Sequence, residues 1–156
     1  NYAKTLMDNR EFKTALELCN ESKRMLEASD REEKEKKELS KKIRDRIDWI
    51  GFNLLAEKAR EYALQHDYKT AAVYYKQAFD QELIKGTHTV RISSVPVLAQ
   101  AGEIELAFKQ LELLTNKFQL GGNGSFIGDP LCKPLHKDPR WEKYMKGLAK
   151  NAGKYQ

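Results

Sequence analysis

The amino-acid sequence predicts an all-α protein built from repeated helical hairpins. Every segment with periodic apolar residues follows the 3.6-residue period of a helix, and no segment alternates apolar and polar residues as a strand does. The segment "DYKTAAVYYKQAF" (67–79) repeats the order acidic, aromatic, Lys, Thr, Ala that is found in "EFKTALELCNESK" (11–23). Such self-similarity is typical of a repeat architecture.

Composition favours one domain over residues 1–156 with a large surface. The chain has 156 residues, of which 40% are hydrophobic and 33% are charged, a balance that suits an elongated helical protein. No stretch approaches the roughly 18 apolar residues of a membrane span. The chain opens without a charged leader and an apolar run, so we expect a signal peptide to be absent or already removed. The two unpaired cysteines, Cys19 and Cys132, favour a reducing cytoplasm, with the periplasm as the alternative if a leader was removed.

Residues 1–28 form the first copy, in which the matching positions are Ala3, Phe12, Ala15 and Cys19. The distance from Ala15 to its counterpart Ala71 is 56 residues, whereas the distance from Ala71 to the next counterpart, Ala107, is 36. The first interval therefore holds about 22 additional residues, and we assign them to a charged helical insertion at 29–51.

The insertion contains only one glycine, at its end, and no proline, and it places acidic and basic residues four apart. Glu32/Lys36, Glu33/Lys37 and Glu38/Lys42 stand at this spacing, which supports a helix, so we expect the segment to be helical. The position of its turn is open. Ser29 with Glu32 forms a capping-box pattern that places the turn early, whereas equal lengthening of the two helices places it near Ser40.

Residues 52–85 carry the fullest copy. Apolar residues recur at i, i+4 and i+7 in two successive helices, namely Leu55, Ala59 and Tyr62, then Ala71, Tyr75 and Ala78. Two matching stripes with a short polar link predict an antiparallel hairpin. Ala59 and Ala71 are small, so they allow close approach where the helices cross, and the tyrosines fill the surrounding space.

This order of residues resembles the tetratricopeptide repeat (TPR), a helix-turn-helix unit of 34 residues. The resemblance covers about residues 3–28 and 52–148 and implies a solenoid of about three stacked hairpins. The third copy, at 88–118, carries the pattern on Leu98, Gly102, Ile104, Ala107, Leu111 and Leu114. Its first helix contains Pro96, which a helix interior does not readily accept. We therefore expect a short helix from Val95 to Ala101, capped by Ser93 or Ser94.

The C-terminal segment 126–150 has two Asp-Pro helix starts, at Asp129 and Asp138. The stretch "DPLCKPLHKDPRW" resembles the segment that closes bacterial TPR arrays, which implies a capping helix over the apolar end of the last hairpin. Trp141, Tyr144 or Met145, and Leu148 share one face of this helix. We expect the Trp141 indole to be buried near Leu111 or Leu114.

Positive charge gathers at the same end of the chain. Residues 133–156 carry a local charge of +5, equal to the net charge of the whole sequence. A patch of this kind can attract nucleic acid or another polyanion. A solvated helix face explains it as well, and we favour that interpretation, so nucleic acid is disfavoured as a partner.

Motifs for catalysis or cofactor binding do not emerge from the sequence. Cys19 and Cys132 form no CxxC pair, and His66, His88 and His136 fit no metal-ligand spacing. The glycine-rich stretch "LGGNGSFIGDP" lacks the GK[ST] ending of a phosphate-binding loop and is interpreted as a flexible linker. We expect no enzyme activity, no cofactor and no metal.

Surface recognition remains, and the TPR resemblance implies a concave groove that holds a peptide or partner protein. The residues that we assign to this groove are Asn53, Arg60, Leu64, Thr89 and Ile92. The family's pattern for binding chaperone C-termini is not met, because Glu57 stands where an Asn is expected. The sequence thus predicts a non-catalytic interaction module or scaffold of bacterial type. The alternatives are polyanion binding through the basic C-terminal helix and an accessory domain of a larger enzyme or regulator.

Overall fold

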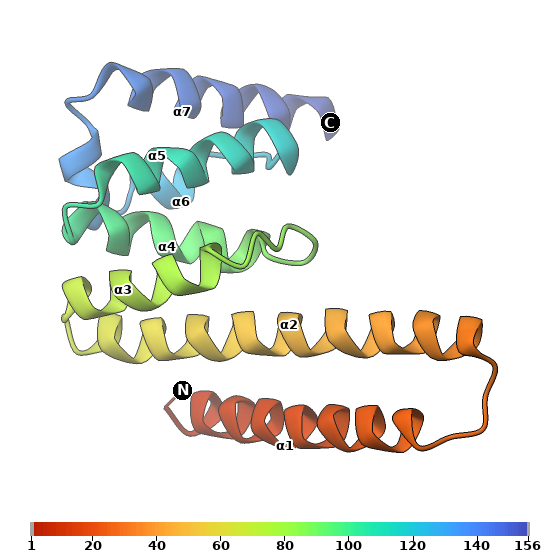
Figure 1. The fold of residues 1–156 in the computed structure, drawn as a ribbon. Coiled ribbons are helices and arrows are strands. Elements are labelled where there is room, and N and C mark those ends of the chain that lie inside the picture. Colours follow the sequence, from red (N-terminus) through yellow and green to blue (C-terminus); the bar gives the residue numbers. More distant parts are fainter. Residues whose placement is uncertain (1, 156) are drawn as a thin grey trace. The chain divides into compact units, whose positions relative to one another are not determined.

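The computed structural model describes residues 2–155, and the side chains of residues 11–154. These residues form helices joined by short turns, and no strand occurs among them (Figure 1). The prediction of an all-α protein is confirmed. The chain divides into two compact units, which are described separately. The first holds residues up to Lys58 and Lys76–Leu83, and the second holds Ala59–Tyr75 and the residues from Ile84 onward.

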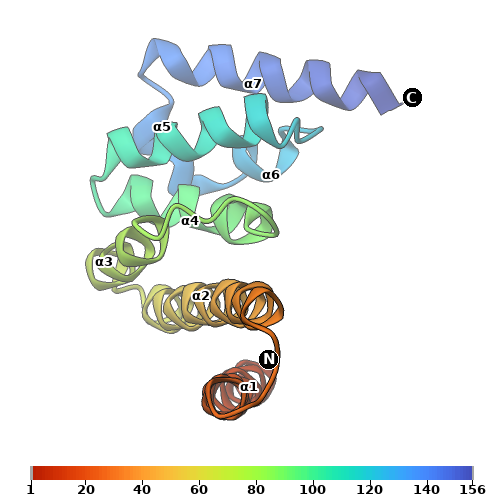
Figure 2. The ribbon, with the colours of Figure 1, turned by 45° about the vertical axis from the view of Figure 1, so that its right-hand side comes forward.

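The first unit is built on two long helices, α1 (Tyr2–Glu27) and the larger part of α2 (Glu33–Leu64), which lie side by side (Figures 1 and 2). Phe12 meets the edge of Trp49 with ring centroids 5.8 Å apart. Phe52 is only 1% exposed and packs on Phe79, from the end of α3 (Tyr68–Phe79), at 6.1 Å. One aromatic contact therefore joins α1 to α2, and a second joins α2 to the end of α3.

The turn between α1 and α2 lies at the early position, next to Ser29. The backbone N–H and the hydroxyl of Ser29 both donate to the carbonyl of Leu26, at 3.2 and 2.7 Å. Ser29 therefore closes the end of α1. The capping-box pattern had indicated that it caps the start of α2, and this is not the case. The carbonyl of Glu32 accepts from the Lys36 N–H in the first hydrogen bond of the helix, so α2 begins at the next residue, Glu33.

The insertion is helical from Glu33 onward, as the spacing of its charges predicted, although the residues at that spacing do not pair with one another. Lys36 pairs with Glu33 at 3.8 Å, three residues before it, and Arg31 pairs with Glu35. The pairs Glu32/Lys36, Glu33/Lys37 and Glu38/Lys42 are not formed in the part of the chain that the structure describes. Two reasons account for this. Glu32 precedes the first turn of α2, and exposed pairs are too weak to select one partner over another.

The second unit begins with a tight crossing between the end of α2 and the start of α3. Ala59 and Ala71 are both fully buried, and Tyr62 stacks on Tyr74 with centroids 5.5 Å apart and planes at 9°. The side chain of Asp67 accepts from the Thr70 N–H at 3.1 Å and so caps α3. Full burial of the two alanines agrees with the prediction of small residues between the two helices, but the tyrosine that stacks on Tyr62 is Tyr74, where the sequence indicated Tyr68 and Tyr75.

A hairpin of α4 (His88–Gln100) and α5 (Ile104–Glu112) follows. The turn between them passes through Gly102, whose φ of +83° is a conformation that glycine adopts without strain. The chain then continues through a π-helical turn, η1 (Leu113–Lys117), to α6 (Gly124–Ile127), the 3-10 helix η2 (Pro130–Leu135), α7 (Pro139–Ala152) and the 3-10 turn η3 (Gly153–Tyr155). The fully buried leucines of this unit are Leu98, Leu111, Leu114, Leu135 and Leu148.

The predicted short helix from Val95 to Ala101 is wrong. Helix α4 starts at His88 and contains Pro96 in its interior. Proline removes one helical hydrogen bond, but the residues around it are buried: Ser94, Val95, Pro96, Val97, Leu98 and Ala99. Ser93 and Ser94 are not caps, because their hydroxyls donate back to the carbonyls of Thr89 and Arg91 within the helix. Burial of the apolar run offsets the lost hydrogen bond.

Both Asp-Pro starts are confirmed. Asp129 accepts from the Leu131 N–H at 2.9 Å at the start of η2, and Asp138 accepts from the Arg140 N–H at 2.9 Å at the start of α7. Each proline occupies the first turn, where its missing N–H costs no helical hydrogen bond.

Burial of Trp141 against the third hairpin is contradicted. The indole is half-buried and packs against His136, from the preceding turn, with centroids 4.6 Å apart and ring planes tilted by 37°. The space over Phe108 is filled by Tyr144, whose ring lies 6.1 Å away, and by the Arg140 guanidinium, 4.2 Å from the ring centre. The buried side of α7 is instead made by Tyr144, Met145, Leu148 and Asn151.

Candidate functional site

The five residues predicted for the groove come from different places in the fold. Asn53 lies on the part of α2 that belongs to the first unit, and its amide donates to the Trp49 carbonyl of its own helix at 2.8 Å. Arg60 and Leu64 lie one turn apart at the end of α2, in the second unit, and both are exposed. Thr89 is exposed and Ile92 is half-buried, both near the start of α4. A shared groove stays a prediction.

Leu64 is the apolar member of this set that faces solvent. Its side chain is 63% exposed, and it lies four residues after Arg60 on the same helix face. A cation and an exposed leucine therefore lie side by side on this surface. The backbone carbonyl of Thr89 accepts a hydrogen bond from the Ser93 hydroxyl, one turn later in α4, at 3.1 Å.

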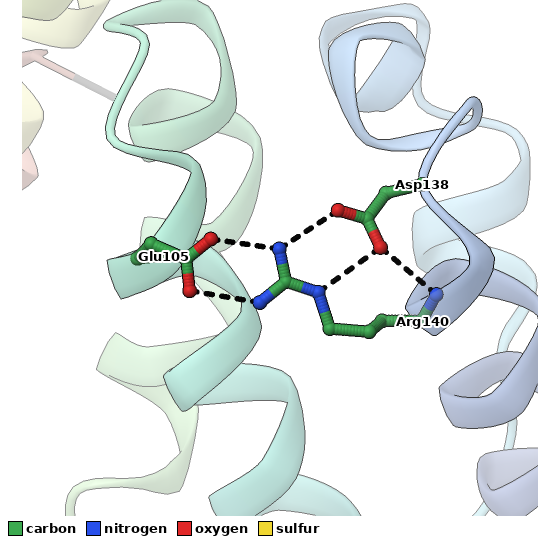
Figure 3. Close-up of polar contacts among 3 residues, drawn as sticks. All are labelled: Glu105, Asp138 and Arg140. Carbon is green, nitrogen blue, oxygen red and sulfur yellow. Dashed lines mark hydrogen bonds and ion pairs between the residues drawn. The ribbon is translucent and has the colours of Figure 1, made fainter.

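A polar cluster in the second unit joins α5 to α7 (Figure 3). The two terminal nitrogens of Arg140 donate to the two carboxylate oxygens of Glu105, each at 2.8 Å. Its Nε and one terminal nitrogen also donate to Asp138, at 3.0 and 2.7 Å. Fork-shaped pairing of this kind is the geometry in which a guanidinium binds carboxylates best. One cation thus links the starts of two helices.

The carboxyl groups of this cluster are not protonated at neutral pH, so they cannot act as general acids. Hydrogen bonds from Arg140 hold the pKa of both Glu105 and Asp138 below their ordinary values, and the same bonds raise the pKa of Arg140. Both carboxyl groups are therefore ionised and occupied. We assign the cluster the role of fixing α7 on α5, which the sequence did not predict. The available signals were Glu105 in the first turn of its helix and the arginine of "DPRW".

A second polar cluster is buried between α4 and α5. Arg91 is only 2% exposed, its Nε donates to the Thr87 hydroxyl at 2.9 Å, and a terminal nitrogen donates to the Gln110 side-chain oxygen at 2.5 Å. Burial lowers the pKa of this guanidinium. Gln110 in turn donates to the Leu106 carbonyl at 3.3 Å. The chain of hydrogen bonds ties the two helices of the hairpin together.

Several of the C-terminal cations already have intramolecular partners. Arg140 is held as described, Lys146 pairs with Glu142 at 2.6 Å, and Lys143 lies 5.6 Å from the centre of the Tyr144 ring. These contacts reduce the positive charge that α7 offers to a polyanion. They agree with a solvated helix face.

The glycine-rich segment is packed along α7. Gly122 N–H donates to the Leu148 carbonyl at 3.0 Å, and the Asn123 amide donates to the Met145 carbonyl at 3.2 Å. A β-carbon built on Gly121 would lie 2.9 Å from the Cα of Ala152, so this approach requires glycine. The segment therefore contacts α7 and helps to position it. The interpretation of this segment as a flexible linker is not supported.

Cys132 is fully buried in η2, as expected for a small apolar filler, and its burial raises the pKa of the thiol to about 12. Among residues 11–154, no three His, Cys, Asp or Glu side chains are grouped to hold a metal ion. Within the described helices, none combines the length and the apolar character that crossing a membrane requires.

Comparison of the sequence with protein-family models and with curated proteins found no match, and comparison with solved structures found none either.

Proposed function

We propose that this chain is a non-catalytic protein-interaction module that binds a peptide or a segment of a partner protein on the surface formed by its helical hairpins. The observation that carries the proposal is the pair Arg60 and Leu64. A leucine that is 63% exposed beside an exposed arginine is a natural anchor for a peptide with an acidic and an apolar residue. Thr89 and Ile92 are the residues of α4 that we assign to the same function.

The repeat pattern of the sequence supports the proposal independently. The order of small and aromatic residues in 52–85 resembles the TPR, in which hairpins present helices to a bound peptide. Asn53 enters the proposal only through this resemblance. A role as a scaffold and a bacterial origin belong to the same proposal.

Polyanion binding by the C-terminal helix is the alternative, and the contacts of that helix disfavour it. Arg140, Lys143 and Lys146 are engaged with Glu105 and Asp138, with the Tyr144 ring and with Glu142. A role as an accessory domain of a larger protein is compatible with the interaction module, because such domains act by binding.

The test compares two double variants as bait for partners from a cell extract, with mass spectrometry as the readout. Arg60→Glu with Leu64→Asp should abolish capture of the proteins that the natural chain retains. Lys69→Glu with Val73→Asp is the matched control, since it makes the same changes on exposed residues of α3, where Val73 is 51% exposed.

Two results would contradict the proposal. In one, both double variants retain the same proteins as the natural chain. In the other, capture is lost in both variants and disappears at moderate salt, which is the behaviour of a polyanion binder. Circular dichroism verifies that each variant keeps its helices.

A further inference from the structure

The first turns of α2 carry a stripe of exposed cations on one face. Lys34, Lys37, Lys41 and Arg44 follow one another at intervals of three, four and three residues, which is the spacing of side chains along one side of a helix. All four side chains are exposed, and in the described part of the chain none of them forms an ion pair. They line a shallow hollow of about 500 Å³ together with Glu38 and Asp45.

The charges of this stripe repeat every seven residues. Seven residues after Lys34 stands Lys41, after Lys37 stands Arg44, and after Glu38 stands Asp45. The charge therefore has the same sign at each of these three positions in two successive heptads. This spacing keeps side chains of one sign on one side of the helix. An acidic helix, whose carboxylates can recur at the same spacing, is therefore complementary to this face in charge.

Helix α1 does not use this stripe. Leu39 and Ile43, which are half-buried, line a hollow with Met25 and Leu26 of α1. At 100° per residue, these positions lie on the opposite side of α2 from Lys37 and Lys41. At the beginning of α2 (orange in Figure 1), one side of the helix thus packs toward α1, and the charged side is exposed to solvent.

We infer that this stripe docks an acidic α-helix of a partner protein, with carboxylates at heptad positions facing Lys34, Lys37, Lys41 and Arg44. Carboxylates three and four residues apart on a helix have the same spacing as these cations. The stripe rises about 15 Å along the helix axis, which corresponds to about three turns of a partner.

Glu38 and Asp45 distinguish a helix from a phosphate backbone. Both acidic groups lie in the lining of the same hollow, where they would repel a continuous line of phosphates. A helix of mixed charge can instead place a lysine opposite each of them. The surface shares no residue with Arg60 and Leu64, so this inference does not depend on the proposed function.

The experiment measures binding of three labelled probes to the full chain by fluorescence anisotropy at low salt. The first probe is a 21-residue helical peptide with glutamates at the heptad positions that face the cations and lysines at those that face Glu38 and Asp45. The second is the same composition in scrambled order. The third is a 20-base-pair DNA duplex. We expect the patterned peptide to bind at least tenfold more tightly than the scrambled one.

Two variants of the chain and one further peptide sharpen the test. Lys37→Glu with Lys41→Glu and Arg44→Glu should weaken binding of the patterned peptide by at least tenfold, since three attractions become repulsions. A peptide with the charges exchanged should bind this variant and not the natural chain. Lys133→Glu with Lys150→Glu and Lys154→Glu makes the same change in net charge on exposed residues elsewhere and should leave binding unchanged.

All three reversed positions are exposed on the surface of α2, so the reversed variant should keep its fold, which circular dichroism checks. The inference is overturned if the patterned and scrambled peptides bind equally, if the control variant weakens binding as much as the reversed one, or if the duplex binds more tightly than the patterned peptide.

Discussion

The guanidinium of Arg140 donates two hydrogen bonds of 2.8 Å to the carboxylate of Glu105. This contact joins the first turn of α7 to the first turn of α5. The same guanidinium lies 4.2 Å from the centre of the Phe108 ring. Charge, hydrogen bonding and ring contact therefore act at one point between the two helices.

Removal of this cation should lower the melting temperature most at neutral pH. Arg140→Met keeps an apolar stem near Phe108 but leaves Glu105 and Asp138 without their shared cation. Both carboxyl groups have folded pKa values below their ordinary values of 4.5 and 3.8, so the stabilisation is present above these values and is lost as pH falls through the folded pKa. The difference in melting temperature between the natural chain and the variant should narrow from about pH 5 downward.

Melting curves followed by circular dichroism between about pH 2 and pH 7 provide the measurement. Lys146→Met is the control, because it removes an exposed pair with Glu142 within a single helix. A difference for Arg140→Met that stays constant over the whole pH range would show that the ion network does not stabilise the fold.

Gly147 should resist replacement by alanine although it lies within α7. Alanine ordinarily stabilises a helix interior by about 1 kcal/mol relative to glycine. Here a β-carbon would lie 2.6 Å from Cγ2 of Thr115, whose hydroxyl is held by the Leu111 carbonyl at 2.8 Å. We expect Gly147→Ala to lower the free energy of unfolding by about 1 to 3 kcal/mol in urea denaturation.

Thr115→Ser tests the cause of this effect, because it removes the clashing methyl group and keeps the hydroxyl. The double variant should recover most of the stability lost by Gly147→Ala. Additive losses in the double variant would place the cause elsewhere.

Leu148 should matter more to stability than the larger Trp141. Leu148 is fully buried, so Leu148→Ala should cost about 2 to 5 kcal/mol by leaving a cavity. Trp141 is half-buried against His136, and water can occupy the space that Trp141→Ala leaves. Urea denaturation followed by circular dichroism should therefore show the smaller loss for Trp141→Ala. A loss equal to that of Leu148→Ala would indicate that the indole is buried in the folded protein.

Ala71 should not accept a larger side chain. It is fully buried at the crossing between the end of α2 and the start of α3, so Ala71→Leu should destabilise the protein by about 1 to 3 kcal/mol. Val73→Leu, at an exposed position of the same helix, should change stability by less than about 0.5 kcal/mol. Equal melting midpoints for Ala71→Leu and the natural chain would mean that the crossing has spare room.

The sequence by itself determined the features that depend on neighbouring residues. Helical periodicity predicted an all-α chain, Asp-Pro pairs predicted the caps at Asp129 and Asp138, and small residues marked the crossing at Ala59 and Ala71. Each signal lies within a few residues of the structure that it forms, because capping, helix period and local size are short-range effects.

Only the tertiary structure decided the rest. It placed Pro96 inside α4, since burial of the surrounding residues outweighs one lost hydrogen bond. It paired Arg140 with Glu105, 35 positions apart, and so left Trp141 on the edge of α7. Contacts between distant segments depend on which side chains fill a shared space with the lowest free energy, and Arg140 with Tyr144 occupies the space over Phe108. A local pattern contains no information on that competition.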